Sequence, residues 1–190
     1  MKRVVYFFLA VISFSFVTNE EVIQREVLIT NESFLYIKGT SNINTFTCVY
    51  DAATLSRKVP VSFTTDNKTT HFKNVQLLLK NSGFNCGNRG INNDFHELLK
   101  THKYPNIHFE LLKTVNHNTT IDTHVAIEIA GIKKQYKVPV IKNGELAPLE
   151  GVLCLNITDF GLTPPRKMMG MIVVKEDIEI VFGFELQLLN

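Results

Sequence analysis

Several features that would indicate a membrane-spanning protein or an enzyme are missing from this sequence of 190 residues. Its longest apolar run, residues 4–17, is too short for the roughly twenty residues of a membrane-spanning helix. Neither a Gly-x-Ser-x-Gly nor a Cys-x-x-Cys motif occurs. His96-Glu97 resembles the start of a zinc-binding His-Glu-x-x-His motif, but Lys100 stands where the second histidine would be. The sequence therefore predicts no metal ligands, no catalytic residues and no cofactor, and a protein that is not an enzyme.

The apolar run has the setting of a secretory signal peptide. Lys2 and Arg3 precede it and polar residues follow it from Thr18, which is the order of segments that directs export. We expect residues 1–17 to be the signal peptide and residues 18–190 to form one domain, located in the periplasm or outside the cell. Small residues suited to cleavage are few at its end, so an uncleaved anchor is the alternative.

A net positive charge is also missing once the signal peptide is set aside. Residues 18–190 hold 18 basic and 18 acidic residues, so the formal net charge of +2 comes from the first residues of the chain. The lysines and arginines are scattered, whereas nucleic-acid binding needs clustered cations that displace counterions. A nucleic-acid partner is therefore not expected.

Three cysteines are few, but in an oxidising compartment two of them would be expected to pair. Cys48 and Cys86 lie in polar, asparagine-rich surroundings, whereas Cys154 lies between Leu153 and Leu155. We expect a disulfide between Cys48 and Cys86, and we expect Cys154 to be a small core residue. Three reduced thiols are the alternative.

Alternation of apolar and polar residues dominates the chain. It is clearest at residues 178–188, where isoleucine, phenylalanine and leucine occupy every second position, the pattern of a strand with one buried face. The other segments with this pattern are Val27–Ile29, Phe34–Gly39, Asn44–Tyr50, Val59–Thr64, Phe72–Leu79, Ile107–Lys113, Thr123–Ala130, Gln135–Val140 and Val152–Ile157. Turn-forming Asn, Asp and Gly residues separate them, which is typical of an antiparallel sandwich or barrel.

One segment has helical periodicity. From Asn92 to Lys103 apolar residues recur at helical spacing behind a capping residue, Asn92 or Asn93, and Tyr104-Pro105 would end the helix. Its apolar stripe needs a surface to pack on, and the mouth of a barrel provides one. The predicted fold is all-β, an antiparallel barrel of about eight strands with one short helix near the mouth.

The aromatic content of the chain gives an indication of what the interior of this barrel contains. The chain has 14 phenylalanines and no tryptophan. A barrel of about eight strands encloses space for side chains or for one small ligand, so the phenylalanines favour a roomy apolar interior. The alternative is that they simply fill the core.

Several segments together resemble the YceI-like family. They are Phe34–Cys48, Gly90–Lys100, Tyr104–Phe109, Ala130–Lys134, Asp159–Leu162, Pro164-Pro165, Met168–Gly170 and Val173–Ile178, and their order and spacing match the family from about residue 27 to residue 190. Each piece alone is weak, whereas the set is fairly specific. Cysteines at 48 and 86 resemble the branch of the family common in Bacteroidetes-type bacteria, which supports their pairing.

The resemblance implies a lipocalin-like, extended barrel with a helix at one end and, in characterised relatives, an isoprenoid chain in the lumen. We therefore expect an exported carrier that holds the apolar tail of a polyisoprenoid or similar amphiphilic lipid. A structural or interaction protein of the envelope with a filled barrel is one alternative. An enzyme with a polar cluster of Asp94, His96 and His102 is another. A transient membrane contact and a dimer are both compatible with the sequence.

Strand alternation and the helix together predict which residues line the lumen. They are Phe34, Tyr36, Phe46, Phe109, Ile127, Ile180, Phe182 and Phe184, with Phe95 and Leu99 from the helix. Where both faces of a strand are apolar, as from Phe34 to Ile37, the inward face is ambiguous. Met168, Met169 and Met171 are expected to form an adaptable rim. The tail would enter past residues 95–102 and be bound by burial of its methylenes, at about 0.8 kcal/mol each.

Overall fold

The computed structural model describes residues 21–142, 148–167 and 171–189. The expected signal peptide, residues 1–17, and the rim residues Met168 and Met169 lie outside the described residues. Within these ranges strands dominate and every pairing is antiparallel, which confirms the all-β class. No helix in the described ranges is long and apolar enough to cross a membrane.

The described strands follow the alternation of the sequence closely. They are β1 (Ile23–Ile29), β2 (Phe34–Ser41), β3 (Thr45–Tyr50), β4 (Arg57–Asp66), β5 (Thr69–Lys80), β6 (Phe84–Asn85), β7 (Asn106–Asn116), β8 (Thr120–Ile129), β9 (Ile132–Lys142), β10 (Leu149–Asn156), β11 (Arg166–Lys167), β12 (Ile172–Phe184) and β13 (Leu186–Leu189). Each predicted strand is present with different bounds, and the segment predicted as one strand at residues 178–188 is divided at Glu185 between β12 and β13. The two-residue strands β6 and β11 were not predicted, because alternation cannot show in so few residues.

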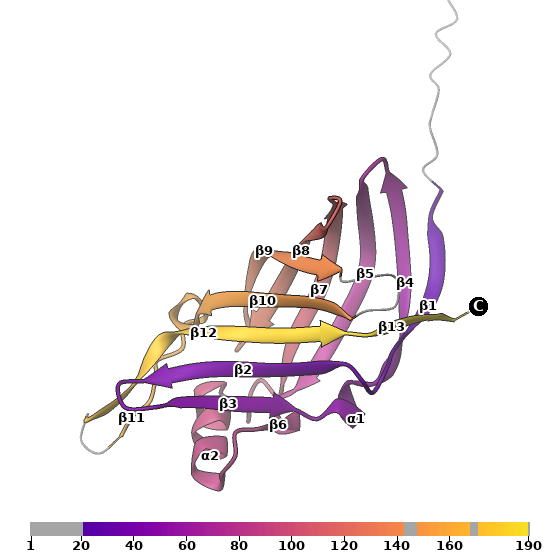
Figure 1. The fold of residues 1–190 in the computed structure, drawn as a ribbon. Helices are drawn as coiled ribbons and strands as arrows, with labels where there is room; N and C mark the ends of the chain where they lie inside the picture. Colours follow the sequence, from indigo (N-terminus) through magenta and orange to yellow (C-terminus); the bar gives the residue numbers. More distant parts are fainter. Residues whose placement is uncertain (1–20, 143–147, 168–170, 190) are drawn as a thin grey trace, which may run out of the picture.

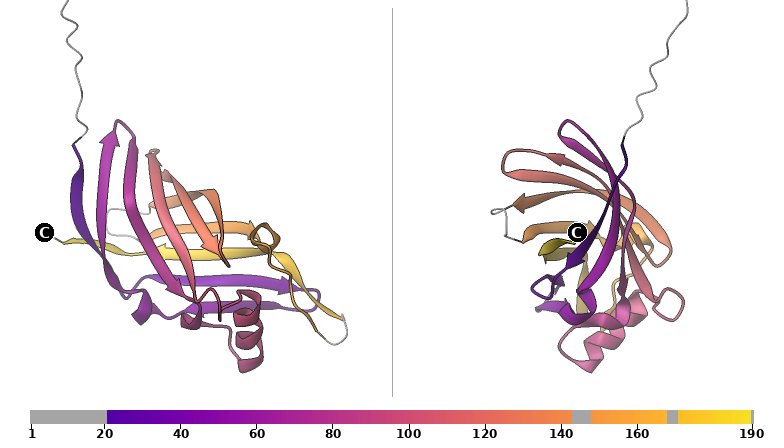
Figure 2. Two further views of the ribbon diagram at one scale, coloured as in Figure 1. Left: turned by 180° about the vertical axis from the view of Figure 1, so that it is seen from behind. Right: turned by 90° about the vertical axis from the view of Figure 1, so that its right-hand side faces the viewer.

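The strands curl into a ring (Figure 1). Neighbours run in the order β1, β4, β5, β7, β8, β9, β10 and β12, and β13, which continues β12 after a single residue, pairs with β1. β2, β3 and β6 extend the sheet from β12, so the chain has more strands than the predicted eight or so. Figure 2 shows the curled sheet from behind and from the side, with the helix below it.

The ring closes where two pairs of consecutive strands, β1 with β2 and β12 with β13, bend side by side. β1 and β2 run antiparallel to β13 and β12, with a break at Thr30–Ser33 opposite Glu185. The amide of Glu185 donates to Ser33 Oγ (2.9 Å), and the Ser33 hydroxyl donates to the Glu185 carbonyl (3.3 Å). Ser33 is 2% exposed. Its hydroxyl therefore satisfies backbone groups that the bend removes from the ladder.

Along the part of β5 that β4 does not reach, side-chain hydrogen bonds take the place of a neighbouring strand. β4 pairs with β5 only before the bulge at Asn74, whose φ is 56°. Beyond the bulge the amide of Lys80 donates to the hydroxyl of Tyr50 in β3 (3.1 Å), and the guanidinium of Arg57 donates to the carbonyl of Leu78 (3.0 Å). These two bonds occupy an edge that would otherwise offer unpaired backbone groups.

The main helix, α2 (Arg89–Leu98), begins and ends earlier than predicted. Its capping residue is Asn88, whose side chain accepts from the amide of Ile91 (3.0 Å). The expected cap Asn92 instead accepts from the amide of Cys86 (2.6 Å), so its side chain is engaged in tying the helix to the preceding loop. The helix stops before Lys100, which adopts a left-handed φ of 52°, and does not reach Tyr104-Pro105.

Three further short helical turns accompany α2. α1 (Ala52–Leu55) was not predicted; it begins at Asp51, whose carboxylate accepts from the amide of Ala53 (3.0 Å). Two 3₁₀ turns, η1 (Asn81–Gly83) and η2 (Ile157–Phe160), follow β5 and β10. One turn of helix is too short to leave a periodic signal, which is why the sequence predicted α2 alone.

The burial of β10 corrects the prediction for Cys154. Leu153 and Leu155 are 5% and 4% exposed, whereas Cys154 between them is exposed to solvent. Side chains alternate between the two faces of a strand, so two inward leucines require an outward cysteine. Cys154 is therefore not a core residue.

Candidate functional site

The interior of the barrel is a narrow apolar cavity, which we call the lumen. Eight strands contribute its lining: Leu35 and Ile37 (β2), Leu77 and Leu79 (β5), Phe84 (β6), Ile107 and Phe109 (β7), Ile127 (β8), Val138 (β9), Leu153 (β10), and Ile180, Phe182 and Phe184 (β12). Within the part of the chain that the structure describes, no polar or ionisable side chain takes part in the lining. Such a surface has no hydrogen bond to offer and binds by desolvation alone.

The free volume of the lumen is about 30 Å³. A cavity of this size holds roughly one water molecule, so the lining side chains themselves fill most of the interior. Phe182 and Phe184 stack with ring centroids 5.2 Å apart. The ring of Phe182 lies over the bare backbone of Gly151, where an added Cβ would come within 2.6 Å of it. The phenylalanine rings are thus the largest side chains that a ligand entering the lumen would have to displace.

Half of the predicted lining residues lie in the lumen. Phe109, Ile127, Ile180, Phe182 and Phe184 line it. Ile127 is 1% and Phe182 is 9% exposed, whereas the other three are half-buried. The strong alternation of residues 178–184 explains why the three β12 residues were found. Their contact with a ligand stays a prediction.

Phe34 and Tyr36 are on the opposite face of β2, so their assignment to the lumen was wrong. In the ladder Leu35 pairs with the inward Phe182, whereas Phe34 and Tyr36 pair with Gly183 and Val181. Paired residues share a face of the sheet, which places Leu35 and Ile37 inside. Phe34 covers Gly183 on the outside, where an added Cβ would come within 2.4 Å of its ring.

The remaining predicted residues surround the lumen without lining it. Phe46 lies on the inner face of β3 but covers Gly39, nearer the β2–β3 turn. Phe95 of α2 packs against Phe84, with ring centroids 5.2 Å apart, and Leu99 is 6% exposed within the same core. The helix therefore supports the lining residue Phe84 from behind.

Sequence reasoning missed eight lumen residues. They are Leu35, Ile37, Leu77, Leu79, Phe84, Ile107, Val138 and Leu153. Leu77 and Leu79 stand in a run of three leucines where alternation is blurred. The signal that would have found them is strand register, since Leu77 pairs with Phe109 and Leu79 with Ile107.

The polar residues of the alternative site, Asp94, His96 and His102, lie on α2 and just after it. Among the described residues, no three His, Cys, Asp or Glu side chains are arranged to hold a metal ion. His96 Nε2 lies 3.3 Å from the carbonyl oxygen of Asn81, and His102 is exposed. Cys48 and Cys86 form a disulfide, which ties β3 to the loop that precedes α2.

The shifted pKa values belong to groups outside the lumen. Burial raises the pKa of Tyr136, and the carboxylate of Asp159 adds to the shift. On the outer surface a hydrogen bond from Lys137 (2.7 Å) lowers the pKa of Asp122, and His117 at 3.1 Å acts in the same direction. Asp122, Lys137 and His117 pair with one another, and neither they nor Tyr136 are among the side chains that line the lumen.

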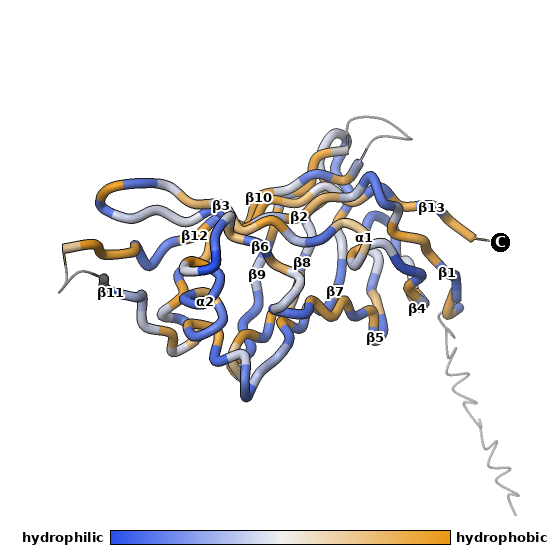
Figure 3. The backbone as a smooth tube through the Cα atoms, turned by 90° about the horizontal axis from the view of Figure 1, so that it is seen from below, coloured by the Kyte–Doolittle hydropathy of each residue, from blue (hydrophilic) through white to orange (hydrophobic). Residues whose placement is uncertain are grey.

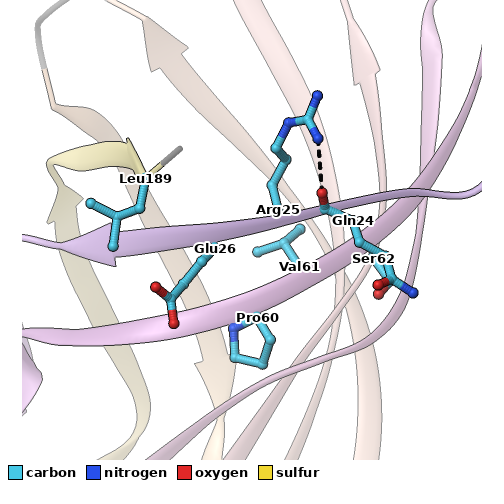
Figure 4. A pocket seen from close by; sticks show the side chains of 7 residues that line it. All are labelled: Gln24, Arg25, Glu26, Pro60, Val61, Ser62 and Leu189. Carbon is cyan, nitrogen blue, oxygen red and sulfur yellow. Dashed lines mark hydrogen bonds between the residues drawn. The ribbon is translucent and has the colours of Figure 1, made fainter.

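A larger but open groove runs along β1 and β4 outside the lumen (Figure 4). Its volume is about 510 Å³, and its walls are Gln24, Arg25, Glu26, Pro60, Val61, Ser62 and Leu189. Arg25 donates to the carbonyl of its neighbour Gln24 (3.0 Å), and Glu26 pairs with the exposed Lys58 (3.3 Å). Exposed polar side chains of this kind stay solvated and offer little binding energy. The lumen is the better candidate site.

Comparison with known proteins identifies this barrel. A family model, the YceI-like domain, matches residues 26–186. The chain belongs to the YceI-like family. No curated protein matches it.

Solved structures of similar fold agree with this membership. BcnA of Burkholderia cenocepacia has a TM-score of 0.62 at 16% identity, over 84% of this chain and 99% of that one. A polyisoprenoid-binding domain from Saccharophagus degradans, implicated in plant cell wall breakdown, has a TM-score of 0.57 at 12% identity, over 87% and 99% of the two chains. At such identities the likeness shows the YceI-like fold alone.

Proposed function

We propose that this YceI-like protein is an exported, non-enzymatic carrier that holds the apolar tail of a polyisoprenoid or similar amphiphilic lipid in its lumen. The observation that carries the proposal is the lining, in which eight strands direct only apolar side chains at one cavity. The polyisoprenoid-binding domain of similar fold supports the choice of ligand. Export rests on the charged and apolar segments of residues 1–17.

Binding in this lumen requires the wall to move. The free volume of about 30 Å³ is much smaller than an isoprenoid tail, so rings such as Phe109 and Phe184 must rotate aside. Each tail methylene then contributes about 0.8 kcal/mol, against the cost of association and of wall rearrangement. An entrance near residues 95–102 remains part of the proposal.

The direct test is extraction of the purified protein with organic solvent, followed by mass spectrometry. The carrier proposal predicts a prenyl lipid in stoichiometric amount.

A matched pair of variants tests the location: Phe184→Ala removes a half-buried ring from the lumen, and Phe34→Ala removes one from the outer face. Because Phe184→Ala lowers the cost of opening the wall, it should raise prenyl-lipid uptake severalfold, whereas Phe34→Ala should not. Equal effects of the two would contradict a lumen site.

The small free volume also favours a second candidate, an envelope protein with a filled barrel and a structural or interaction role. Such a protein would yield no lipid on extraction. Its melting temperature would also stay unchanged when prenyl lipids are added, because only a ligand that binds the folded state raises it.

A further inference from the structure

The β2–β3 turn is joined to Met171 and the start of β12 at one end of the molecule, beside β11 in Figure 1. The side chain of Asn42, in the β2–β3 turn, accepts from the amide of Val173 (3.0 Å) and donates to the carbonyl of Met171 (2.8 Å). The amide of Asn42 donates to the carbonyl of Val173 (3.1 Å). One asparagine thus holds the start of β12 against the turn.

This joined end exposes large apolar side chains. Ile43 is 64%, Met171 is 63% and Val173 is 37% exposed; we call these three residues the apolar tip. Figure 3 shows hydrophobic segments on both joined strands at this end. A cluster of exposed apolar side chains at one extremity is typical of an interaction surface.

Hydrogen bonds stabilise the turn around Ile43, whereas the isoleucine side chain itself does not contribute to its stability. Ser41 Oγ accepts from the amides of Asn44 (3.0 Å) and Ile43 (3.3 Å), and the amide of Ser41 donates to the carbonyl of Asn44 (2.7 Å). Turns favour small polar residues and glycine, and a β-branched side chain that points to water does not stabilise one. Folding therefore does not explain Ile43.

The charge next to the apolar tip is positive. Every ionisable residue from Gly161 to Lys175 is basic, and residues 40–47 contain no ionisable residue at all. Arg166, which pairs with Val173, is exposed, and so is Lys175. Glu176 and Asp177 follow further along β12, where Asp177 accepts from Asn156 (2.9 Å). Apolar side chains flanked by basic ones match the chemistry of an anionic lipid surface.

An apolar path leads from the tip towards the lumen. Phe46, three residues after Ile43, covers Gly39, and Gly39 pairs with Ile178. Both Phe46 and Ile178 are half-buried and pack against the core. Two positions beyond them are Ile37 and Ile180, which line the lumen.

We propose that the apolar tip docks on the surface of an anionic bilayer, with Ile43 and Met171 inserted among the lipids and Arg166 and Lys175 near the headgroups. This inference rests on the proposed function, because a carrier of an insoluble lipid must collect it from a membrane. The occupant is the bilayer itself rather than the lipid held in the lumen.

A tryptophan reporter tests this docking at a single position. The chain contains no tryptophan, so Ile43→Trp gives the only indole signal. Its emission should shift to shorter wavelength with vesicles of phosphatidylglycerol and phosphatidylcholine, because the ring leaves water. Val49→Trp, at an outer position that is 51% exposed, should not shift. The emission of this indole reports only on the tip. A measurement of total vesicle binding would also include any binding through the apolar run at residues 4–17. No shift for Ile43→Trp, or equal shifts, would overturn the proposal.

Affinity for the same vesicles provides the second test. The double variant Ile43→Ser/Met171→Ser should bind at least about tenfold more weakly than the unchanged chain, whereas Val49→Ser/Val152→Ser, which removes two exposed valines elsewhere, should bind as before. Arg166→Gln/Lys175→Gln should weaken binding only to anionic vesicles. Equal binding by both double serine variants would contradict docking through the tip.

Uptake of a prenyl lipid from detergent solution separates the two proposals. The tip variants should retain this uptake, because their lumen is unchanged. Loss of uptake in every protein, with docking intact, would remove the carrier function and leave the membrane contact. Loss of docking with uptake intact would remove the membrane contact and leave the carrier function.

Discussion

Cys154 presents its thiol to solvent, while Leu153 and Leu155 beside it point into the barrel. Its neighbours in the sequence are apolar, so composition alone suggested a core residue. The face of the sheet, rather than the character of adjacent residues, decides the exposure of a strand residue. The difference matters for chemistry, because an exposed thiol reacts and a buried one is inert.

Thiol labelling checks this arrangement. Without reductant, the native chain should take up one equivalent of a maleimide, at Cys154, since Cys48 and Cys86 are bonded and buried. After denaturation with reductant it should take up three. Peptide mapping by mass spectrometry identifies the sites. Native labelling at Cys48 or Cys86, or none at Cys154, would contradict the structure.

Tyr50 shows how one hydroxyl closes a gap between strands. It is 2% exposed and accepts the amide of Lys80 at 3.1 Å. Tyr50→Phe should lower the free energy of unfolding by about 1–2 kcal/mol, because the amide loses its partner. Chemical denaturation measures the change. Tyr36→Phe on the outer face is the control and should stay within about 0.5 kcal/mol; equal losses in both variants would refute the role of the bond.

At the scale of elements, the existence of each main strand could be predicted, but its inward face only where alternation is strict. In β12 the large apolar residues from Ile178 to Phe184 alternate with Glu179, Val181 and Gly183, and the lumen residues of this strand were identified. β2 is apolar on both faces at Phe34–Ile37, and the choice made there was wrong. The pairing of Leu35 with Phe182 settles it, and that pairing joins residues far apart in the chain, which local patterns do not encode.

Helix α2 illustrates the same limit on a smaller scale. Three asparagines, Asn88, Asn92 and Asn93, are all suitable caps by sequence. Asn92 is occupied by the amide of Cys86, a contact that depends on the folded loop. Closure of the ring through β13 depends likewise on the bend at Glu185, which has no local signal.

The disulfide joins β3 to the loop between β6 and α2 and should contribute strongly to stability. Cys48 and Cys86 are separated by 38 residues, and closing such a loop in the unfolded chain corresponds to about 4 kcal/mol. The double variant Cys48→Ala/Cys86→Ala should lose about that much free energy of unfolding, measured by urea denaturation. Cys154→Ala, the matched control, should change it by less than about 0.5 kcal/mol. A double variant as stable as the control would show that the bond adds nothing.

At the scale of the whole molecule, the barrel combines an apolar interior with two surfaces of different character. Among the described residues, only apolar side chains line the lumen. The paired ions Asp122, Lys137 and His117 lie on the outside. The apolar tip stands at one end. A carrier that collects a lipid at a membrane and shields its tail from water needs this division of surfaces.

Photo-crosslinking is the sharpest test of whether the tail of a prenyl lipid occupies the lumen. The purified chain is loaded with a prenyl lipid that carries a diazirine in its tail, irradiated, digested and mapped by mass spectrometry. If the tail lies in the lumen, adducts should form on lumen residues such as Leu77, Phe109, Ile180 and Phe184. Adducts confined to outer-face residues such as Val49 and Val152, or no adducts above those of a heat-denatured sample, would contradict it.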